Sequence, residues 1–402
     1  MERADVIILG GGMIGLTLAV ALDRHGLSSI VVDPMPPEAI KAPGFDGRAT
    51  AVSSSSWRML EAIGIGERIG DQGCPIRSIK VSDGLRPGGL VFDPGQGEDP
   101  LGIMFENRLL RATLRAAAES APNVTLMTPA TPAETVRDGA GVRVTLKDGR
   151  QIGAPLLVGS EGRNSPAREA ANIRMARWSY DHVAIVATVT HEQPHDNVAY
   201  EIFYPAGPFA ILPMLPGNRS AIVWSVKERD SKAFLDLPDR ALAAEIEKKM
   251  GGFLGPLELA APRSSYKLGF HHAARITAQR LVLAGDSAHG IHPIAGQGLN
   301  LGFRDVAALA QVLVEGARIG MDLGDAQLLA RYERWRSLDS LMVAAATDGL
   351  TRIYGVPGRA ASAIRRFGMG LVQRVGPVKS WLMSEARGEN GDLPLLLRGL
   401  TI

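Results

Sequence analysis

Two short apolar runs flank a segment with helical spacing in the first 33 residues. The runs DVIIL (5–9) and SSIVVD (28–33) each have the length and composition of one buried strand. Between them, MIGLTLAVALDRHG (13–26) places apolar residues at the spacing of an α-helix. This order predicts a strand–helix–strand unit, and therefore a parallel sheet that is covered by helices.

From about residue 178 the chain changes to β-rich segments punctuated by glycine and proline: HVAIVATVTHE, NVAYEIFYPAGPFAILPMLP and RSAIVWSVKE. These segments predict an antiparallel sheet that forms a second domain. RLVLAGD (280–286) then predicts a return to a buried strand, and the apolar spacing after it predicts a long helix that begins near Gly298. The first domain is therefore expected to be discontinuous in sequence.

Composition narrows the class of protein. A chain of 402 residues is long enough for about two or three domains. Its 44 basic and 42 acidic residues give a net charge of +2, which argues against a nucleic-acid-binding protein. The single cysteine, Cys74, excludes an internal disulfide and a multi-thiolate metal site. With no signal-peptide pattern and no apolar run of about 20 residues, we expect a cytoplasmic protein.

The turn GGGMIG has the spacing of a dinucleotide-binding loop. It places Gly10, Gly12 and Gly15 between the predicted strand and helix. Gly10 would allow the tight turn, Gly12 the approach of a pyrophosphate, and Gly15 close packing of the helix. Asp33, at the end of the second strand, is placed to bind a ribose hydroxyl. The alternative is that these glycines serve only a turn.

A second glycine-rich stretch, GIGERIG (64–70), has a similar appearance but a different context. It follows a segment with helical spacing, SSWRMLEAI, and not a strand. Glycine in that position is typical of a helix C-terminus. We therefore predict one dinucleotide-binding loop in this chain.

The stretch LAGDSAHGIHPIAGQGLN (283–300) concentrates reactive side chains, which could serve one of three chemistries. A hydrolase nucleophile turn fails because His289 stands where the second glycine is required. A zinc site at His289 and His292 is disfavoured because Gly290 and Pro293 interrupt a helix and no third ligand is near. We expect no metal.

The third chemistry, a cofactor site, fits the order of the parts. A carboxylate at Asp286 ends a buried strand and can accept hydrogen bonds from a polyol. The glycines that lead into the helix near Gly298 would present free N–H groups and the positive end of the helix dipole to an electron-rich ligand. For a flavin, these ligands would be the ribityl chain and the pyrimidine edge of the ring.

Four motifs in order resemble the class A flavoprotein monooxygenases, the group typified by p-hydroxybenzoate hydroxylase. They are GGGMIG, DGR (46–48), GSEGRNSPAR (159–168) and GDSAHGIHPIAGQGLNLGF (285–303). With EIFYPAGPFAILPM, the last motif looks closest to the ubiquinone-biosynthesis hydroxylases. The resemblance implies an α/β fold: a Rossmann-like FAD-binding domain (1–76, 106–172 and 276–340), a β-sheet substrate domain (77–105 and 173–275) and a C-terminal helical region (341–402).

The resemblance also assigns roles to residues at matching positions. Gly10, Gly12 and Gly15 would hold the FAD pyrophosphate, and Asp33 the adenosine ribose. Arg48 would contact the pyrophosphate or the flavin, and Asn107 or Arg108 would contact the flavin. Asp286 would bind the ribityl chain, and the pyrimidine edge would be bordered by Gly298, Leu299 and Asn300. Pro293 would lie beside the ring, and His289 and His292 would be structural or ring-adjacent. Pro293 and His292 are the flavin-adjacent catalytic candidates, and the catalytic base is unassigned.

One motif departs from the family pattern. The usual Asp–Gly pair of the middle motif is Glu161–Gly162 here. Because this motif is associated with both FAD and NAD(P)H, the longer carboxylate is expected to rearrange the network it shares with Arg163 and Arg168.

The activity implied by the resemblance is hydroxylation of a hydrophobic, (poly)prenylated phenol with O2 through a flavin C4a-hydroperoxide, with NAD(P)H as the transient electron donor. Phe203, Tyr204, Phe209 and Leu212 are candidates for the substrate wall, or are ordinary sheet core. Two alternatives stay open: a flavin-dependent reductase or dehydrogenase of the same superfamily, and a non-catalytic FAD-stabilised subunit that binds other quinone-biosynthesis enzymes.

The segment 351–384 carries six basic residues and no acidic one, interleaved with apolar residues. A basic amphipathic segment can lie on an anionic membrane surface, which would place the protein peripherally on the inner face of a membrane. The alternative is a helical segment that packs on the core with its arginines in solvent.

Overall fold

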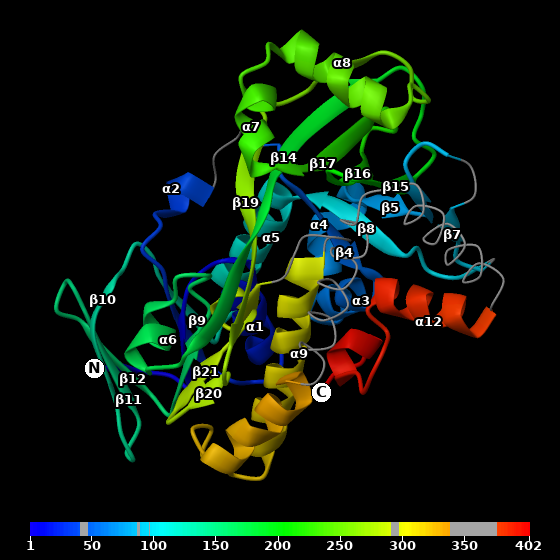
Figure 1. Cartoon of the computed structure of the whole chain (residues 1–402). Coiled ribbons are helices and arrows are strands. Elements are labelled where there is room, and N and C mark those ends of the chain that lie inside the picture. Colours follow the sequence, from blue (N-terminus) through cyan, green and yellow to red (C-terminus); the bar gives the residue numbers. More distant parts are fainter. Residues whose placement is uncertain (41–46, 87–88, 96, 291–296, 338–375) are drawn as a thin grey trace.

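The computed structural model describes residues 1–40, 47–86, 89–95, 97–290, 297–337 and 376–402 (Figure 1). The predicted strand–helix–strand unit is confirmed: β2 (Val6–Leu9) and β3 (Ser29–Val32) are parallel and buried, and α1 (Met13–Asp23) connects them. They belong to a six-stranded sheet in the order β20-β21-β13-β2-β3-β9. The other strands of this sheet are β9 (Val124–Met127), β13 (Leu156–Gly159), β20 (Thr277–Ala278) and β21 (Leu281–Leu283).

Strands distant in sequence meet in this sheet. β13 pairs in parallel with β2 on one side and with β21 on the other, so the ends of all three lie at one edge. Helix α1 packs against α5 (Asn107–Ser120) and α9 (Gln297–Arg318). The return to a buried strand near residue 281 and the long helix that follows it are thus confirmed.

The predicted antiparallel sheet is also present, with nine strands. It contains β6 (Ser78–Asp83), β7 (Leu90–Phe92), β14 (Met175–His191), β15 (Val198–Tyr204), β16 (Gly207–Met214), β17 (Arg219–Lys227), β18 (Leu257–Leu259), β19 (Ser264–Ala273) and β22 (His289–Gly290). All pairs are antiparallel except β15 with β6, which is parallel. Helices α7 (Glu228–Leu235) and α8 (Asp239–Met250) cover one face, as Figure 1 shows.

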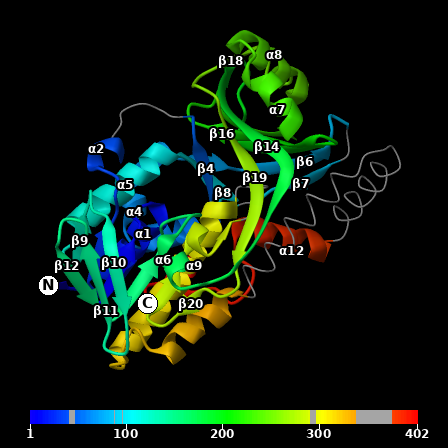
Figure 2. The same cartoon turned by 60° about the vertical axis from the view of Figure 1, so that its left-hand side comes forward.

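A small three-stranded sheet lies between the two large sheets (Figure 2). Its order is β4-β8-β5, with β4 (Ala49–Ser53), β5 (Cys74–Ile76) and β8 (Gly102–Glu106). A fourth sheet, with the order β1-β12-β11-β10, lies at the N-terminal side. Its strands are β1 (Glu2–Arg3), β10 (Pro132–Arg137), β11 (Val142–Leu146) and β12 (Gln151–Ala154).

The remaining helices are short, and one of them explains the second glycine-rich stretch. They are α2 (Pro37–Ile40), α3 (Ser54–Ala62), α4 (Ile65–Ile69), η1 (Gly70–Gln72), α6 (Pro166–Ala170), η2 (Gly285–Ser287), α12 (Gly376–Arg387) and η4 (Leu395–Arg398). Gly64 has a φ of 82° just after α3, so it ends a helix as predicted. In the described residues, no helix is both long and apolar enough to span a bilayer.

A buried charge network connects α9 with the helix that includes residues 326–337. The Asp305 carboxylate on α9 lies 2.7 Å from Arg336 Nε and 2.7 Å from His289 Nε2, and it accepts a hydrogen bond from the Gly285 N–H at 2.9 Å. Burial alone would raise the pKa of Asp305, but the charges and hydrogen bonds of His289 and Arg336 hold it down at about 2. The Asp305 carboxylate therefore connects α9 with the segment after β21 and with the helix that includes residues 326–337.

Substitution of Asp305→Asn is expected to destabilise the protein strongly, because it removes the buried negative charge that lies 2.7 Å from Arg336 Nε and His289 Nε2. We expect a loss of about 3–5 kcal/mol of unfolding free energy, measured by chemical denaturation. In the wild type this contribution is present above pH about 4 and is lost as the pH falls toward 2. The exposed Asp230→Asn is the control, and equal stabilities for the two variants would contradict the network.

Candidate active site

The glycine turn has the geometry that each glycine was predicted to provide. Gly10 has a φ of +105°, which an L-residue rarely adopts, and an added Cβ would overlap the Ser160 carbonyl. At Gly15 a Cβ would overlap the Gly10 carbonyl, so α1 packs directly on the turn. At Gly12, by contrast, no atom of the described residues lies within 4 Å of an added Cβ. The turn is thus closed behind Gly10 and Gly15 and open in front of Gly12.

Asp33 is oriented by this turn. One of its carboxylate oxygens accepts the Gly11 N–H at 2.6 Å and the other accepts the Met35 N–H at 2.7 Å. A carboxylate oxygen can accept more than one hydrogen bond, so both retain capacity for hydroxyl donors. Its partly exposed side chain is held at the end of β3, beside the start of α1.

The Asp286 segment joins the glycine turn through α1. The side chain of Ile14 approaches both Gly285 and Gly302: added Cβ atoms there would lie 3.1 and 2.5 Å from its carbons. Ser287 donates to the Gly159 carbonyl at 2.5 Å, and His271 Nε2 lies 2.8 Å from the Asp286 carbonyl oxygen. The backbone around Asp286 is therefore fixed, while its carboxylate is exposed and able to accept hydrogen bonds.

Strand β4 brings the next group of predicted residues together. The Asn107 N–H donates to the Arg48 carbonyl at 3.0 Å, and Thr50 Oγ1 donates to Asn107 Oδ1 at 2.6 Å. Arg108 pairs with the buried Glu106 at 2.5 Å. The Arg48 side chain is exposed at the same corner. Arg48, Asn107 and Arg108 thus converge where β4 begins and α5 starts.

Asn300 connects that strand to the start of α9. Its side-chain amide donates to the Ala51 carbonyl at 2.9 Å and accepts the Ser53 N–H at 2.9 Å. The side chain of Asn300 is therefore engaged with β4, which leaves the backbone of the first turn to face a ligand. Leu299 packs on the main core, and no described atom lies within 4 Å of a Cβ added at Gly298.

Glu161, where the middle motif differs from the family pattern, acts as a helix cap. Glu161 accepts a hydrogen bond from Ser165 Oγ at 2.5 Å and lies 3.4 Å from the Ala167 N–H, at the N-terminus of α6. Burial raises the pKa of Glu161, although Ser165 and the Ala167 N–H act in the opposite direction. In the described residues its carboxylate makes no hydrogen bond to Arg163 or Arg168.

Arg168 has a role that sequence analysis did not assign. Its side chain is 1% exposed, and one amino group donates to the Arg163 and Ser287 carbonyls, both at 3.0 Å. It therefore links the middle motif directly to the Asp286 segment. The other amino group makes no hydrogen bond within the described residues. Only the placement of the two motifs at neighbouring strand ends could have indicated this link.

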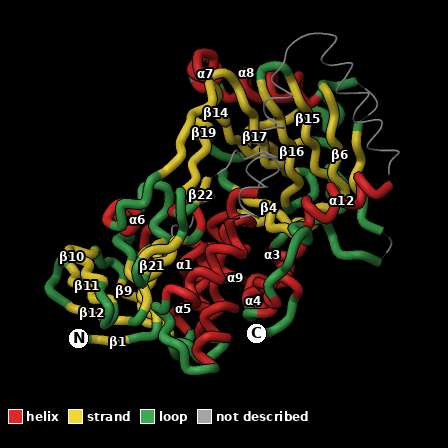
Figure 3. Tube along the Cα trace, turned by 60° about the horizontal axis from the view of Figure 1, so that its bottom comes forward, coloured by secondary structure: helices red, strands yellow, loops and turns green. Residues whose placement is uncertain are grey.

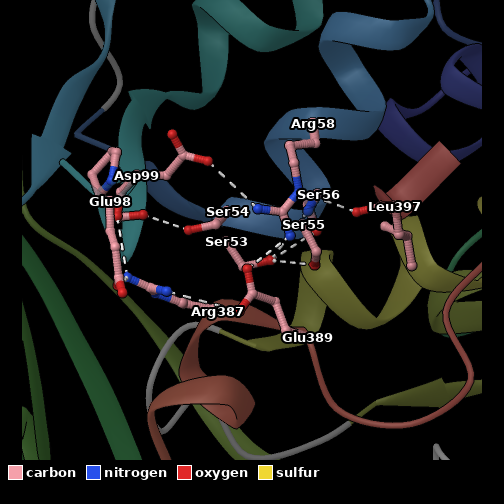
Figure 4. A network of polar contacts seen from close by, with 11 residues as sticks. Ser53, Ser54, Ser55, Ser56, Arg58, Glu98, Asp99, Arg387, Glu389 and Leu397 are labelled. Atoms are coloured by element: carbon pink, nitrogen blue, oxygen red, sulfur yellow. Dashed lines mark hydrogen bonds and ion pairs between the residues drawn. The ribbon is translucent and has the colours of Figure 1, made fainter. Parts of the chain in front are cut away.

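The C-terminal segment 387–398 packs over the serine run 53–56 (Figure 4). Sequence analysis did not predict this contact. Arg58 on α3 binds Glu389 at 2.8 Å, and Arg387 at the end of α12 binds Glu98 at 2.5 Å. Between these arginines, Gly388 lies so close that an added Cβ would be 2.5 Å from Ser55 Oγ. Residues 387–398 thus brace the strand that Asn300 contacts.

The structure separates some of the remaining candidates. Phe209 is fully buried in the core under α7 and α8, so it is sheet core and no substrate wall, and Tyr204 packs against the same core. Leu212 packs on the opposite face, toward β4, β5 and β8. His289 is in the Asp305 network, which agrees with its structural interpretation. His292 and Pro293 lie outside the described residues.

These positions fit one extended ligand. Asp33, the opening before Gly12, the Asp286 carboxylate and the first turn of α9 follow one another along contacts that include Ile14 and Gly285. An N–H-rich turn suits a pyrophosphate, and carboxylates at either side suit ribose and ribityl hydroxyls. The arrangement suits a dinucleotide bound in the Rossmann manner.

Comparison with known proteins gives the same class. A family model described as "FAD binding domain" matches residues 3–346. The chain therefore belongs to this family of FAD-binding proteins, and it is an FAD-dependent enzyme of the monooxygenase class. The expected α/β fold, with its Rossmann-like FAD-binding part, β-rich part and C-terminal helices, is confirmed.

Individual relatives cover nearly the whole chain. The ubiquinone hydroxylase UbiL of Rhodospirillum rubrum is 43% identical over 99% of this chain and 94% of its own length. The 3-demethoxyubiquinol 3-hydroxylase of Escherichia coli is 31% identical over 96% of this chain and 99% of its own. The crystal structure of p-nitrophenol 4-monooxygenase from Pseudomonas putida shares the fold, with a TM-score of 0.80 at 17% identity and coverage of 97% and 99%.

Substitutions at Gly12 and Gly15 are expected to separate binding from folding. Gly12→Val should keep the thermal stability of the FAD-free protein but weaken FAD binding by at least about tenfold, because its side chain fills the opening. Gly15→Val should lower stability as well, because it pushes α1 off the turn. Fluorescence titration with FAD and thermal melts measure the two effects. Unchanged FAD affinity in Gly12→Val would contradict the assignment.

Proposed function

We propose that this enzyme hydroxylates the aromatic ring of a (poly)prenylated phenol in ubiquinone biosynthesis. The proposal rests on the contact of Asn300, at the start of α9, with β4, because β4 belongs to one apolar cluster with a face of the nine-stranded sheet. Ubiquinone-biosynthesis hydroxylases among its relatives support the same substrate class. An apolar wall suits a prenylated ring, since burial of each CH2 contributes about 0.8 kcal/mol.

The chain's residues would hold the cofactor and exclude water. Gly12 and the start of α1 would bind the pyrophosphate, Asp33 the ribose and Asp286 the ribityl hydroxyls. The N–H groups at the start of α9 would favour negative charge at the ring's pyrimidine edge. Bound FAD would supply the activation of O2, with NAD(P)H as electron donor. Arg168, buried between the two motifs, would fix their relative positions.

Oxygen labelling tests the proposed reaction. The purified yellow protein should oxidise NAD(P)H faster when a prenylphenol is present, and with 18O2 one labelled oxygen should enter the ring. We expect this incorporation to separate a monooxygenase from a reductase or dehydrogenase, which would give an unlabelled product. A non-catalytic subunit would bind FAD and partner enzymes but form no product. Unlabelled product, or none, would refute the proposal.

We also propose that α12 contacts a membrane surface. Most of the basic segment 351–384 lies outside the described residues, and only 376–384 can be placed. There, Val378 and Trp381 are 42% and 52% exposed, one helical turn apart, with Lys379 between them. An exposed tryptophan beside a basic residue suits the interface of an anionic bilayer.

Trp381→Ser is expected to weaken sedimentation with anionic phospholipid vesicles by about tenfold, which corresponds to the loss of about 1.4 kcal/mol of aromatic burial. Trp178, which is 40% exposed on β14, offers a control of the same residue type as Trp178→Ser. Equal vesicle binding by both variants and the wild type would rule out contact through α12.

A further inference from the structure

Glu201 on β15 lies on the face of the nine-stranded sheet that packs toward β4, β5 and β8. In strand β15, Tyr200, Ile202 and Tyr204 pack into the core under α7 and α8. Glu201 alternates with them and therefore lies on the other face, together with Ala199. Its neighbours across the strands are Val81 on β6 and Ala210 on β16. Glu201 is thus a carboxyl group among small and apolar side chains.

This face of the sheet lies next to β4, the strand that Asn300 contacts at the start of α9. Ala199 and Val81 belong to one apolar cluster with Ala49 and Ala51 of β4. The carbonyl of Ala51 accepts the hydrogen bond from Asn300 at the start of α9. Figure 3 shows β15 and β16 on the side of the large sheet near β4. A ring held between this face and the cofactor would therefore lie near Glu201.

The Glu201 carboxyl has no partner in the described part of the chain: no hydrogen bond or ion pair reaches it. Glu201 is partly exposed and its carboxyl oxygens are not enclosed by the protein, so they can accept a hydrogen bond from a ligand hydroxyl. The titratable groups on this face of the neighbouring strands are Asp83 on β6 and Arg219 and Lys227 on β17, and Cys74 and Glu106 lie on β5 and β8, which pack against it. Lys80 of β6 lies on the opposite face, over the Tyr200 ring. Burial is the sole cause that raises the pKa of Glu201, to about 7.

We propose that Glu201 binds the phenol hydroxyl of the substrate and accepts its proton. The phenol O–H bond breaks, the proton moves to a Glu201 carboxylate oxygen, and the electron pair stays on the phenolate oxygen. The electron-rich ring then receives one oxygen atom from O2, with NAD(P)H supplying two electrons and the second oxygen leaving as water. The ring proton is lost to solvent, and Glu201 returns its proton to the phenolate. This assignment rests on the proposed function.

The pH dependence of turnover tests the assignment. With a short-chain 2-prenylphenol in micelles, wild-type kcat/KM should rise with pH through about 7, because the carboxylate is the active form. Glu201→Gln should lose this rise and fall by about 100-fold at high pH, whereas Glu201→Asp should retain the rise at lower activity. Glu258→Gln, at an exposed position of β18 in the same sheet, is the control and should match the wild type.

Two measurements distinguish a catalytic role of Glu201 from a structural role. In substrate-free wild type and Glu258→Gln, the infrared band of a protonated carboxyl should disappear as the pH rises through about 7. Glu201→Gln should show no such change. The melting temperature of Glu201→Gln should not fall, because the carboxyl has no partner to lose. A wild-type pH profile in Glu201→Gln overturns the Glu201 assignment alone. An inactive wild type overturns the proposed function, and the assignment with it.

Discussion

The contact between Ile14 and the two glycines Gly285 and Gly302 is the constraint on which the cofactor site depends. It brings together three segments that lie almost 300 positions apart in sequence: the start of α1, the turn after β21 and the first half of α9. A side chain at Gly302 would displace the end of the Ile14 side chain, and one at Gly285 would be strained by its φ of +63°. The contact therefore brings the glycine loop and the Asp286 segment together.

Polar networks on both sides stabilise the contact of Ile14 with Gly285 and Gly302. Asp305 on α9 accepts a hydrogen bond from the Gly285 N–H and contacts His289, and Arg336 is the compensating charge. On the other side, Asn300 binds β4, and the C-terminal segment closes over α3 through Arg58 and Glu389. Because Asp305 and Arg336 are both buried, loss of either partner would leave a charge without compensation, which holds this arrangement in place. The carboxylate of Asp286 is left exposed at the centre of this rigid frame.

Local patterns were sufficient for much of the fold. The periodicity of residues 5–33 and the glycine spacing depend only on near neighbours, and both correspond to β2, α1 and β3. The apolar spacing that follows Gly298 corresponds in the same way to α9. Long-range pairings left no such local trace. The link from Arg168 to Ser287, the clasp of residues 387–398 and the capping of α6 by Glu161 each depend on where distant segments meet. Glu201 did carry a signal, since it is the one acid in the otherwise apolar strand VAYEIFY, but only the register shows which face it occupies.

A crystal structure of the enzyme with FAD tests the central claim most directly, because the claim is that one ligand occupies a single track. We predict one FAD with its pyrophosphate at the Gly12 N–H, its ribose at Asp33, its ribityl chain at Asp286 and its pyrimidine edge at the start of α9. An FAD that leaves Asp286 and the start of α9 without contact would contradict the account.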